Sequence, residues 1–151
     1  MIKYIIALNN INLFNNYIKP HIKPKYHQLV DNDDGDTMFK KYNFGLANSD
    51  VSDDDIVVFV HEDVRILDEN FEQKLEILFN NYPSVGIAGV IGTTSFTSMG
   101  GWWLGDRTQN GRGHIMQDRP DLSEPFHMVD RIGNFFDVVS VDGCCFAMRG
   151  S

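Results

Sequence analysis

A continuous run of apolar residues that ends in three polar ones is the feature that most constrains the fold of this chain. Residues Ile56–Val60 read I-V-V-F-V, and His61, Glu62 and Asp63 follow directly. An unbroken apolar run of this length is typical of a strand covered on both faces, as in a parallel α/β sheet. Open α/β sheets bind ligands at the carboxyl ends of their strands. The acidic pair is therefore expected at a ligand site, where it can hold a divalent cation and, through it, a phosphate.

The length and composition predict a globular protein with one domain. The 151 residues are enough to bury a sizeable core, and we expect residues 1–151 to form a single domain. Apolar residues make up 42% of the chain and charged residues 23%, which is ordinary for a soluble protein. No apolar run approaches the roughly 20 residues that cross a bilayer. The first eight residues are typical of a strand rather than a secretory signal. These features predict a cytoplasmic protein without a transmembrane segment.

Charge and cysteine usage exclude two further classes of function. The formal net charge is −8, and nucleic-acid binders need clustered basic residues, so no nucleic-acid partner is expected. The two cysteines, Cys144 and Cys145, are adjacent, and the chain has no C-x-x-C motif that would suggest a zinc site. We interpret them as reduced, half-buried strand residues.

Alternating strand and helix patterns predict an α/β fold with a mostly parallel central sheet flanked by helices. One helix is expected to begin at Asp36 or Thr37, with Met38, Tyr42 and Leu46 on its inner side. A second helix is expected to begin after Asp68. Residues 93–126 show no sustained period and are predicted to be a long functional loop. Strands are predicted at Lys3–Leu8, Tyr26–Val30, Ile56–Val60, Val85–Ile91, Phe136–Val141 and Cys144–Met148.

The sequence does not match several common ligand-binding and catalytic motifs. The acidic turn Asp31–Asp36 lacks the glycine and glutamate that a calcium-binding EF-hand loop requires at its sixth and twelfth positions. The glycines of Gly86–Gly92 do not match the dinucleotide-binding G-x-G-x-x-G pattern. The chain has neither a phosphate-binding G-x-x-x-x-G-K-[ST] motif nor a G-x-S-x-G nucleophile motif. A solvated turn and a buried strand explain these two segments.

Five segments, in this order, resemble the GT-A glycosyltransferases of the family 2-like group. They are Phe39–Ser49, Asp55–Val64, Val85–Gly92, Gly100–Trp103 and Val141–Arg149. The resemblance implies a GT-A fold of the nucleotide-diphospho-sugar transferase type. It also implies transfer of a sugar, with inversion, from a nucleoside-diphosphate sugar donor to a saccharide or other hydroxyl acceptor. Fold-level analogy does not by itself establish a function.

The same resemblance assigns roles to the acidic residues after the central strand. Asp63 would bind Mn²⁺ or Mg²⁺, and Glu62 would lie near the ribose or the metal. The chain departs from the family's D-x-D motif because His61 occupies the first position. A cation held by carboxylates would neutralise the charge that develops on the departing nucleoside diphosphate.

Other residues receive roles by position in the family pattern, each with a structural alternative. Asn9 and Asp31 would contact the nucleoside, or would cap a helix or turn. Trp102 and Trp103 would stack on a sugar, or would pack their loop onto the core. Asp142 would orient the transferred sugar or the acceptor and is the expected catalytic residue.

The chain ends at Ser151, whereas a catalytic base carboxylate normally follows the segment that resembles Val141–Arg149 in the family. We therefore expect a glycosyltransferase truncated at its C-terminal side to the donor-binding part, or a shortened relative. Two alternatives stay open. One is a non-catalytic nucleotide-sugar-binding module. The other is a phosphate-handling hydrolase, although its D-x-D-x-T motif is absent after Val60.

Overall fold

A computed structural model describes residues 1–23, 27–30, 37–96, 107–118, 121, 123, 126–131 and 135–150. The chain divides into two compact units. The first combines Met1–Ala88 with Gly143–Ser151, and the second is Gly89–Asp142. The first unit is therefore built from two separate stretches of the sequence.

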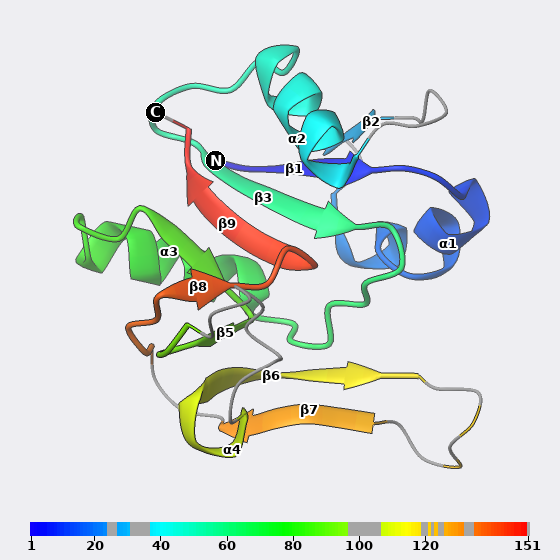
Figure 1. The fold of residues 1–151 in the computed structure, drawn as a ribbon. Helices are drawn as coiled ribbons and strands as arrows, with labels where there is room; N and C mark the ends of the chain where they lie inside the picture. Colours follow the sequence, from blue (N-terminus) through cyan, green and yellow to red (C-terminus); the bar gives the residue numbers. More distant parts are fainter. Residues whose placement is uncertain are drawn as a thin grey trace. The chain divides into compact units, whose positions relative to one another are not determined.

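Apart from Gly89, the last residue of β4, the first unit contains a five-stranded sheet in the order β2-β1-β3-β9-β4 (Figure 1). β1 runs parallel to both β2 and β3, whereas β9 runs antiparallel to β3. The predicted central position of the strand at residues 56–60 is confirmed, because β3 is the middle strand. The strand bounds are Ile2–Ala7 for β1, His27–Val30 for β2, Ile56–His61 for β3, Ile87–Gly89 for β4 and Cys145–Arg149 for β9.

The helices of this unit begin and end largely where local sequence signals place them. Thr37 caps α2, as predicted, by accepting a hydrogen bond from the Lys40 backbone N–H. The prediction for α3 is wrong by two residues, because Asn70 is its N-cap and Asp68 instead accepts the Asn70 backbone N–H. The bounds are Ile11–Asn16 for α1, Lys19–His21 for the 3₁₀ helix η1, Met38–Ala47 for α2 and Phe71–Asn81 for α3.

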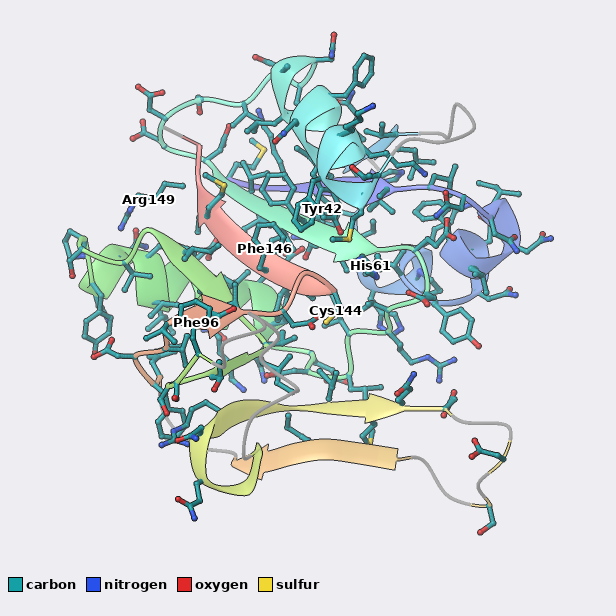
Figure 2. The ribbon with its side chains drawn as sticks, in the orientation of Figure 1. Tyr42, His61, Phe96, Cys144, Phe146 and Arg149 are labelled. Carbon is teal, nitrogen blue, oxygen red and sulfur yellow. The ribbon has the colours of Figure 1, made fainter. Side chains whose placement is uncertain are left out.

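An aromatic cluster joins α2 to the sheet. The Tyr42 ring meets Phe59 edge-on at 5.1 Å, and Phe146 stacks on Phe59 at 4.8 Å. Figure 2 shows Tyr42 and Phe146 close together beside β3. Met38 and Leu46 pack against the same cluster, so the predicted inner side of α2 is confirmed. This packing fixes the position of α2 relative to the ends of β1 and β3.

The second unit contains a four-stranded sheet in the order β7-β6-β5-β8. β5 pairs antiparallel with β6 and β8, and β6 pairs antiparallel with β7. The bounds are Ile91–Thr93 for β5, Gly111–Gln117 for β6, Phe126–Arg131 for β7, Ser140–Val141 for β8 and Arg107–Asn110 for the short helix α4.

Three sequence predictions in this region are wrong. The expected strand Phe136–Val141 is shorter than predicted, because only Ser140–Val141 pair in the sheet, as β8. The expected buried strand Val85–Ile91 is divided between β4 and β5, which belong to different sheets, and Ile87 is 51% exposed. The expected long loop contains the strand β6. Across the described ranges, no helix has both the length and the apolar composition needed to span a membrane.

Candidate functional site

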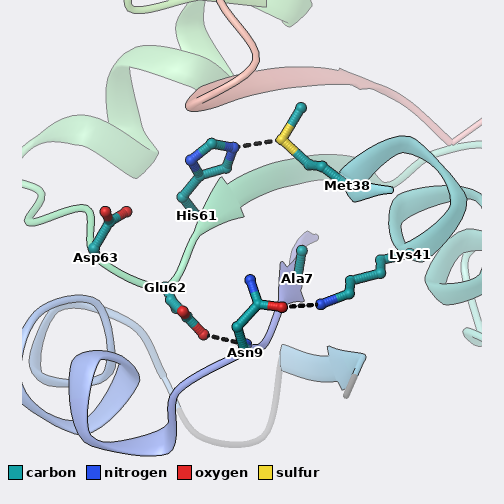
Figure 3. Close-up of a pocket in the computed structure, with 7 residues that line it drawn as sticks. All are labelled: Ala7, Asn9, Met38, Lys41, His61, Glu62 and Asp63. Carbon is teal, nitrogen blue, oxygen red and sulfur yellow. Dashed lines mark hydrogen bonds between the residues drawn. The ribbon is translucent and has the colours of Figure 1, made fainter. Parts of the chain in front are cut away.

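A pocket of about 170 Å³ lies where β1 and β3 end (Figure 3). The two strands are parallel, with Ile2 paired to Ile56 at their start and Ala7 paired to His61 at their end. The segments that follow β1 and β3 therefore leave the sheet side by side. α2, held by its aromatic packing, supplies the third side. The lining residues are Ala7, Asn9, Met38, Lys41, His61, Glu62 and Asp63.

Asp63 lies in the turn that follows β3 and is exposed to solvent. Within the described part of the chain, its carboxylate has neither a hydrogen-bond partner nor an ion pair. A carboxylate without protein partners retains its oxygen lone pairs for a ligand or cation. Asp63 lies just after the carboxyl end of the central strand, and its metal binding stays a prediction.

Glu62 has the opposite environment, with only 7% of its surface exposed. Its Oε2 atom accepts the backbone N–H groups of Asn9 at 2.5 Å and of Asn10 at 2.8 Å. These charge-assisted hydrogen bonds fasten the β1–α1 connection to the end of β3. The predicted donor contact of Glu62 stays a prediction, and the structure adds a bracing role that the sequence did not indicate.

Lys41 is a pocket residue that the sequence analysis missed. It is 3% exposed, and its Nζ donates to the Leu8 carbonyl oxygen at 2.9 Å and to Asn9 Oδ1 at 2.5 Å. A helical signal was available, because Lys41 follows Met38 by three residues and so falls near the inner face of α2. Two adjacent lysines are typical of a solvent-exposed helix face, so the sequence did not indicate that Lys41 is buried.

His61 occupies the position where the family motif has an aspartate. Its backbone N–H donates to the Cys144 carbonyl oxygen at 3.0 Å, and its Nε2 contacts the sulfur of Met38. The Tyr42 ring lies 6.5 Å from the imidazole, between ring centroids. His61 is thus held on one side by Cys144, which directly precedes β9, and on the other by Met38 of α2.

The structure does not test the roles predicted for four further residues. Asp31, Trp102 and Trp103 fall outside the described residues. Asp142 is the last residue of the second unit, and its backbone N–H donates to the Ile91 carbonyl oxygen at 2.9 Å. Their assigned roles stay predictions.

The donor set of the pocket is compatible with a hard divalent cation. No group of three His, Cys, Asp or Glu side chains gathers in a metal-binding arrangement among the residues that the structure describes. Mg²⁺ and similar ions in phosphate-handling sites are commonly bound by one or two carboxylates, with substrate phosphates and water completing the shell. Asp63 could supply one such carboxylate, and Glu62 has a second oxygen that is not used in its bonds to Asn9 and Asn10.

A comparison of the chain with known protein families identifies the family to which it belongs. The model of a glycosyltransferase-like family matches residues 4–151, which is nearly the whole chain. The protein therefore belongs to this glycosyltransferase-like family, and the resemblance noted from the sequence is confirmed. A search of curated proteins finds no match to the chain.

Proposed function

We propose that this chain is a glycosyltransferase with a GT-A type fold, or the donor-binding portion of one. It would transfer a sugar, with inversion, from a nucleoside-diphosphate sugar to a saccharide or other hydroxyl acceptor. The observation that carries the proposal is the position of Asp63, an exposed carboxylate without a described protein partner in a pocket at the carboxyl edge of the central sheet. Membership of the glycosyltransferase-like family supports it.

Each pocket residue has a role that follows from its chemistry. Asp63 would hold Mn²⁺ or Mg²⁺, and Glu62, which keeps the β1–α1 connection in place, would assist donor binding. When bound, such a cation supplies charge neutralisation for the departing nucleoside diphosphate. Asn9 would contact the nucleotide, and Asp142 would orient the sugar or the acceptor.

Thermal unfolding with and without ligand tests the binding step. Mn²⁺ together with UDP or GDP, at about 100 times the dissociation constant, should stabilise the native state by roughly 2.7 kcal/mol. Asp63→Ala should remove the metal-dependent part of this stabilisation. The matched control is Glu76→Ala, which removes an exposed carboxylate from α3 outside the pocket and should leave it unchanged. An unaltered shift in Asp63→Ala would contradict the assigned metal site.

Donor turnover separates an enzyme from a binding module. Incubation of the chain with UDP- and GDP-sugars and Mn²⁺ should release nucleoside diphosphate and free sugar, with water as the acceptor, in an Asp63-dependent manner. Binding without release would favour the alternative of a non-catalytic nucleotide-sugar-binding module.

A further inference from the structure

The buried charge of Lys41 is the feature of the pocket that the proposed function leaves unused. Only 3% of this residue is exposed, yet its two hydrogen-bond acceptors are neutral oxygens. Among the described residues it has no carboxylate partner, since Glu62 directs its bonded oxygen to the Asn9 and Asn10 backbone. A buried ammonium group is costly unless an anion pairs with it. A bound anion would supply that missing partner.

The hydrogen bonds of Lys41 also determine which way the Asn9 amide points. A lysine ammonium group can only donate, so the amide oxygen of Asn9 must face it. The amide NH₂ group then faces the other way, and Figure 3 shows this nitrogen on the side of Asn9 remote from Lys41. Two of the three Nζ donors are used within the protein. The pocket therefore presents a donor from Asn9 and a remaining donor from Lys41.

We propose that Lys41, together with the side-chain amide of Asn9, binds an anionic phosphate oxygen of the ligand. This inference rests on the proposed function and specifies that Lys41 and Asn9 bind the diphosphate group of the donor. Figure 3 shows Lys41 and Asp63 on opposite sides of the pocket, with Asn9 and Glu62 between them. A diphosphate can thus meet a positive charge at either end, from Lys41 at one and from a cation on Asp63 at the other.

Three variants test the proposal. Lys41→Met removes the charge, and Lys40→Met removes a neighbouring exposed lysine of α2 as the matched control. Asn9→Asp replaces the amide donor with an internal carboxylate that can pair with Lys41, so the fold should be at least as stable as in the wild type. Titration calorimetry with UDP, inorganic pyrophosphate and uridine, each with Mn²⁺, measures affinity, and thermal unfolding without ligand measures stability.

We expect Lys41→Met and Asn9→Asp to weaken UDP and pyrophosphate binding roughly tenfold to hundredfold, as for lost charge-assisted hydrogen bonds. Uridine binding should change little in Lys41→Met, and Lys40→Met should bind all probes as the wild type does. Equal losses of uridine and UDP binding in Lys41→Met would overturn the proposal in favour of base recognition. Wild-type affinities in Asn9→Asp would also overturn it, because a merely structural lysine gives that result.

The same experiment separates this inference from the proposed function. Pyrophosphate binding that depends on Lys41, without any preference for a nucleotide, would retain the anion site and contradict the glycosyl-donor assignment. Nucleotide binding that depends on Asp63 and is unaffected in both pocket variants would retain the donor assignment and contradict the role of Lys41. If no probe binds to the wild type, both are contradicted.

Discussion

Glu62 and Asp63 are adjacent carboxylates with different physical roles. The Glu62 carboxylate is buried and accepts two backbone N–H groups, whereas Asp63 is exposed and has no described partner. Removing a buried acceptor leaves its donors unsatisfied, which costs about 1–3 kcal/mol or more when a charge is involved. Removing an exposed side chain usually changes stability by less than about 0.5 kcal/mol.

We therefore predict that Glu62→Ala lowers the free energy of unfolding by about 3 kcal/mol and that Asp63→Ala leaves it nearly unchanged. Urea unfolding without metal or nucleotide measures both values. Similar losses in the two variants would mean that the β1–α1 connection does not depend on Glu62.

Asp55 is a second buried carboxylate, at the start of β3, and it makes stability depend on pH. It is 5% exposed, and its Oδ2 accepts the Ser52 backbone N–H at 2.8 Å and pairs with Lys3 at 2.9 Å. The Ser52 backbone N–H is the largest cause that holds the pKa of Asp55 well below its usual range, and Lys3 acts in the same direction while burial opposes it. A carboxylate whose pKa is lowered by folding stabilises the folded state at pH values above its unfolded-state pKa of about 3.9. This contribution is lost as the pH falls through the folded-state pKa.

We predict that Asp55→Asn lowers the free energy of unfolding by about 2 kcal/mol at pH 7. The difference from the wild type should narrow progressively below about pH 4, where the wild-type carboxylate begins to lose its advantage. Urea unfolding at several pH values measures it, with the exposed Asp53→Asn as control. A difference that stays constant down to pH 2 would show that the Asp55 charge contributes nothing.

At the scale of elements, the sequence predicted those parts whose signals are local. The apolar run at residues 56–60 became β3, and Thr37 caps α2 as its side-chain chemistry indicates. β6 was missed because its glycines and polar residues give no clear alternation, and its pairing with β5 depends on distant contacts. The candidate site likewise has a part that the sequence predicts and a part that it does not. The position of Asp63 follows from strand order, whereas the partners of Glu62 and Lys41 exist only once β1, β3 and α2 have packed together.

Gly45 shows how packing overrides local propensity within α2. A glycine weakens a helix by about 1 kcal/mol relative to alanine, yet α2 continues past it to Ala47. A Cβ atom at this position would lie 2.5 Å from Ile5 Cγ2 and 2.8 Å from Val30 Cγ2. Both neighbours are β-branched strand residues with little rotameric freedom. The glycine is what allows the helix to approach β1 and β2.

Gly45→Ala should therefore destabilise the protein by about 1–2 kcal/mol, because overpacking outweighs the gain in helix propensity. Gly86→Ala is the matched control, since a Cβ atom there meets nothing within 4 Å. Chemical denaturation of the two variants measures the difference. A stabilised Gly45→Ala would mean that α2 can move away from the sheet without loss.

At the scale of the molecule, the most consequential feature is that the first unit is discontinuous in sequence. β9 pairs with β3 from Ile56 to Val60, and Cys145 and Ala147 within it are 2% and 1% exposed. Local patterns predicted a strand in this segment but not its partner, because pairing between residues so far apart leaves no local signal. The described residues that line the pocket all belong to this unit.

This arrangement predicts the behaviour of two shortened chains. Residues 1–88 alone should unfold without cooperativity, because β3 would lose its β9 partner and Phe59 would lose the stacked ring of Phe146. The same residues joined to residues 143–150 by a flexible linker of roughly 12 Gly/Ser residues should regain a cooperative transition, since such a linker restores the pairing at modest entropic cost. Circular dichroism during urea unfolding measures both transitions.

The joined chain also tests where the binding site resides. Because the described pocket residues belong to the first unit, the joined chain should keep the stabilisation by Mn²⁺ and nucleoside diphosphate and its dependence on Asp63. Sugar transfer should be lost, because Asp142, the residue assigned to orient sugar or acceptor, belongs to the second unit. Loss of nucleotide binding in a joined chain that folds cooperatively would instead require the second unit to contribute directly to donor binding.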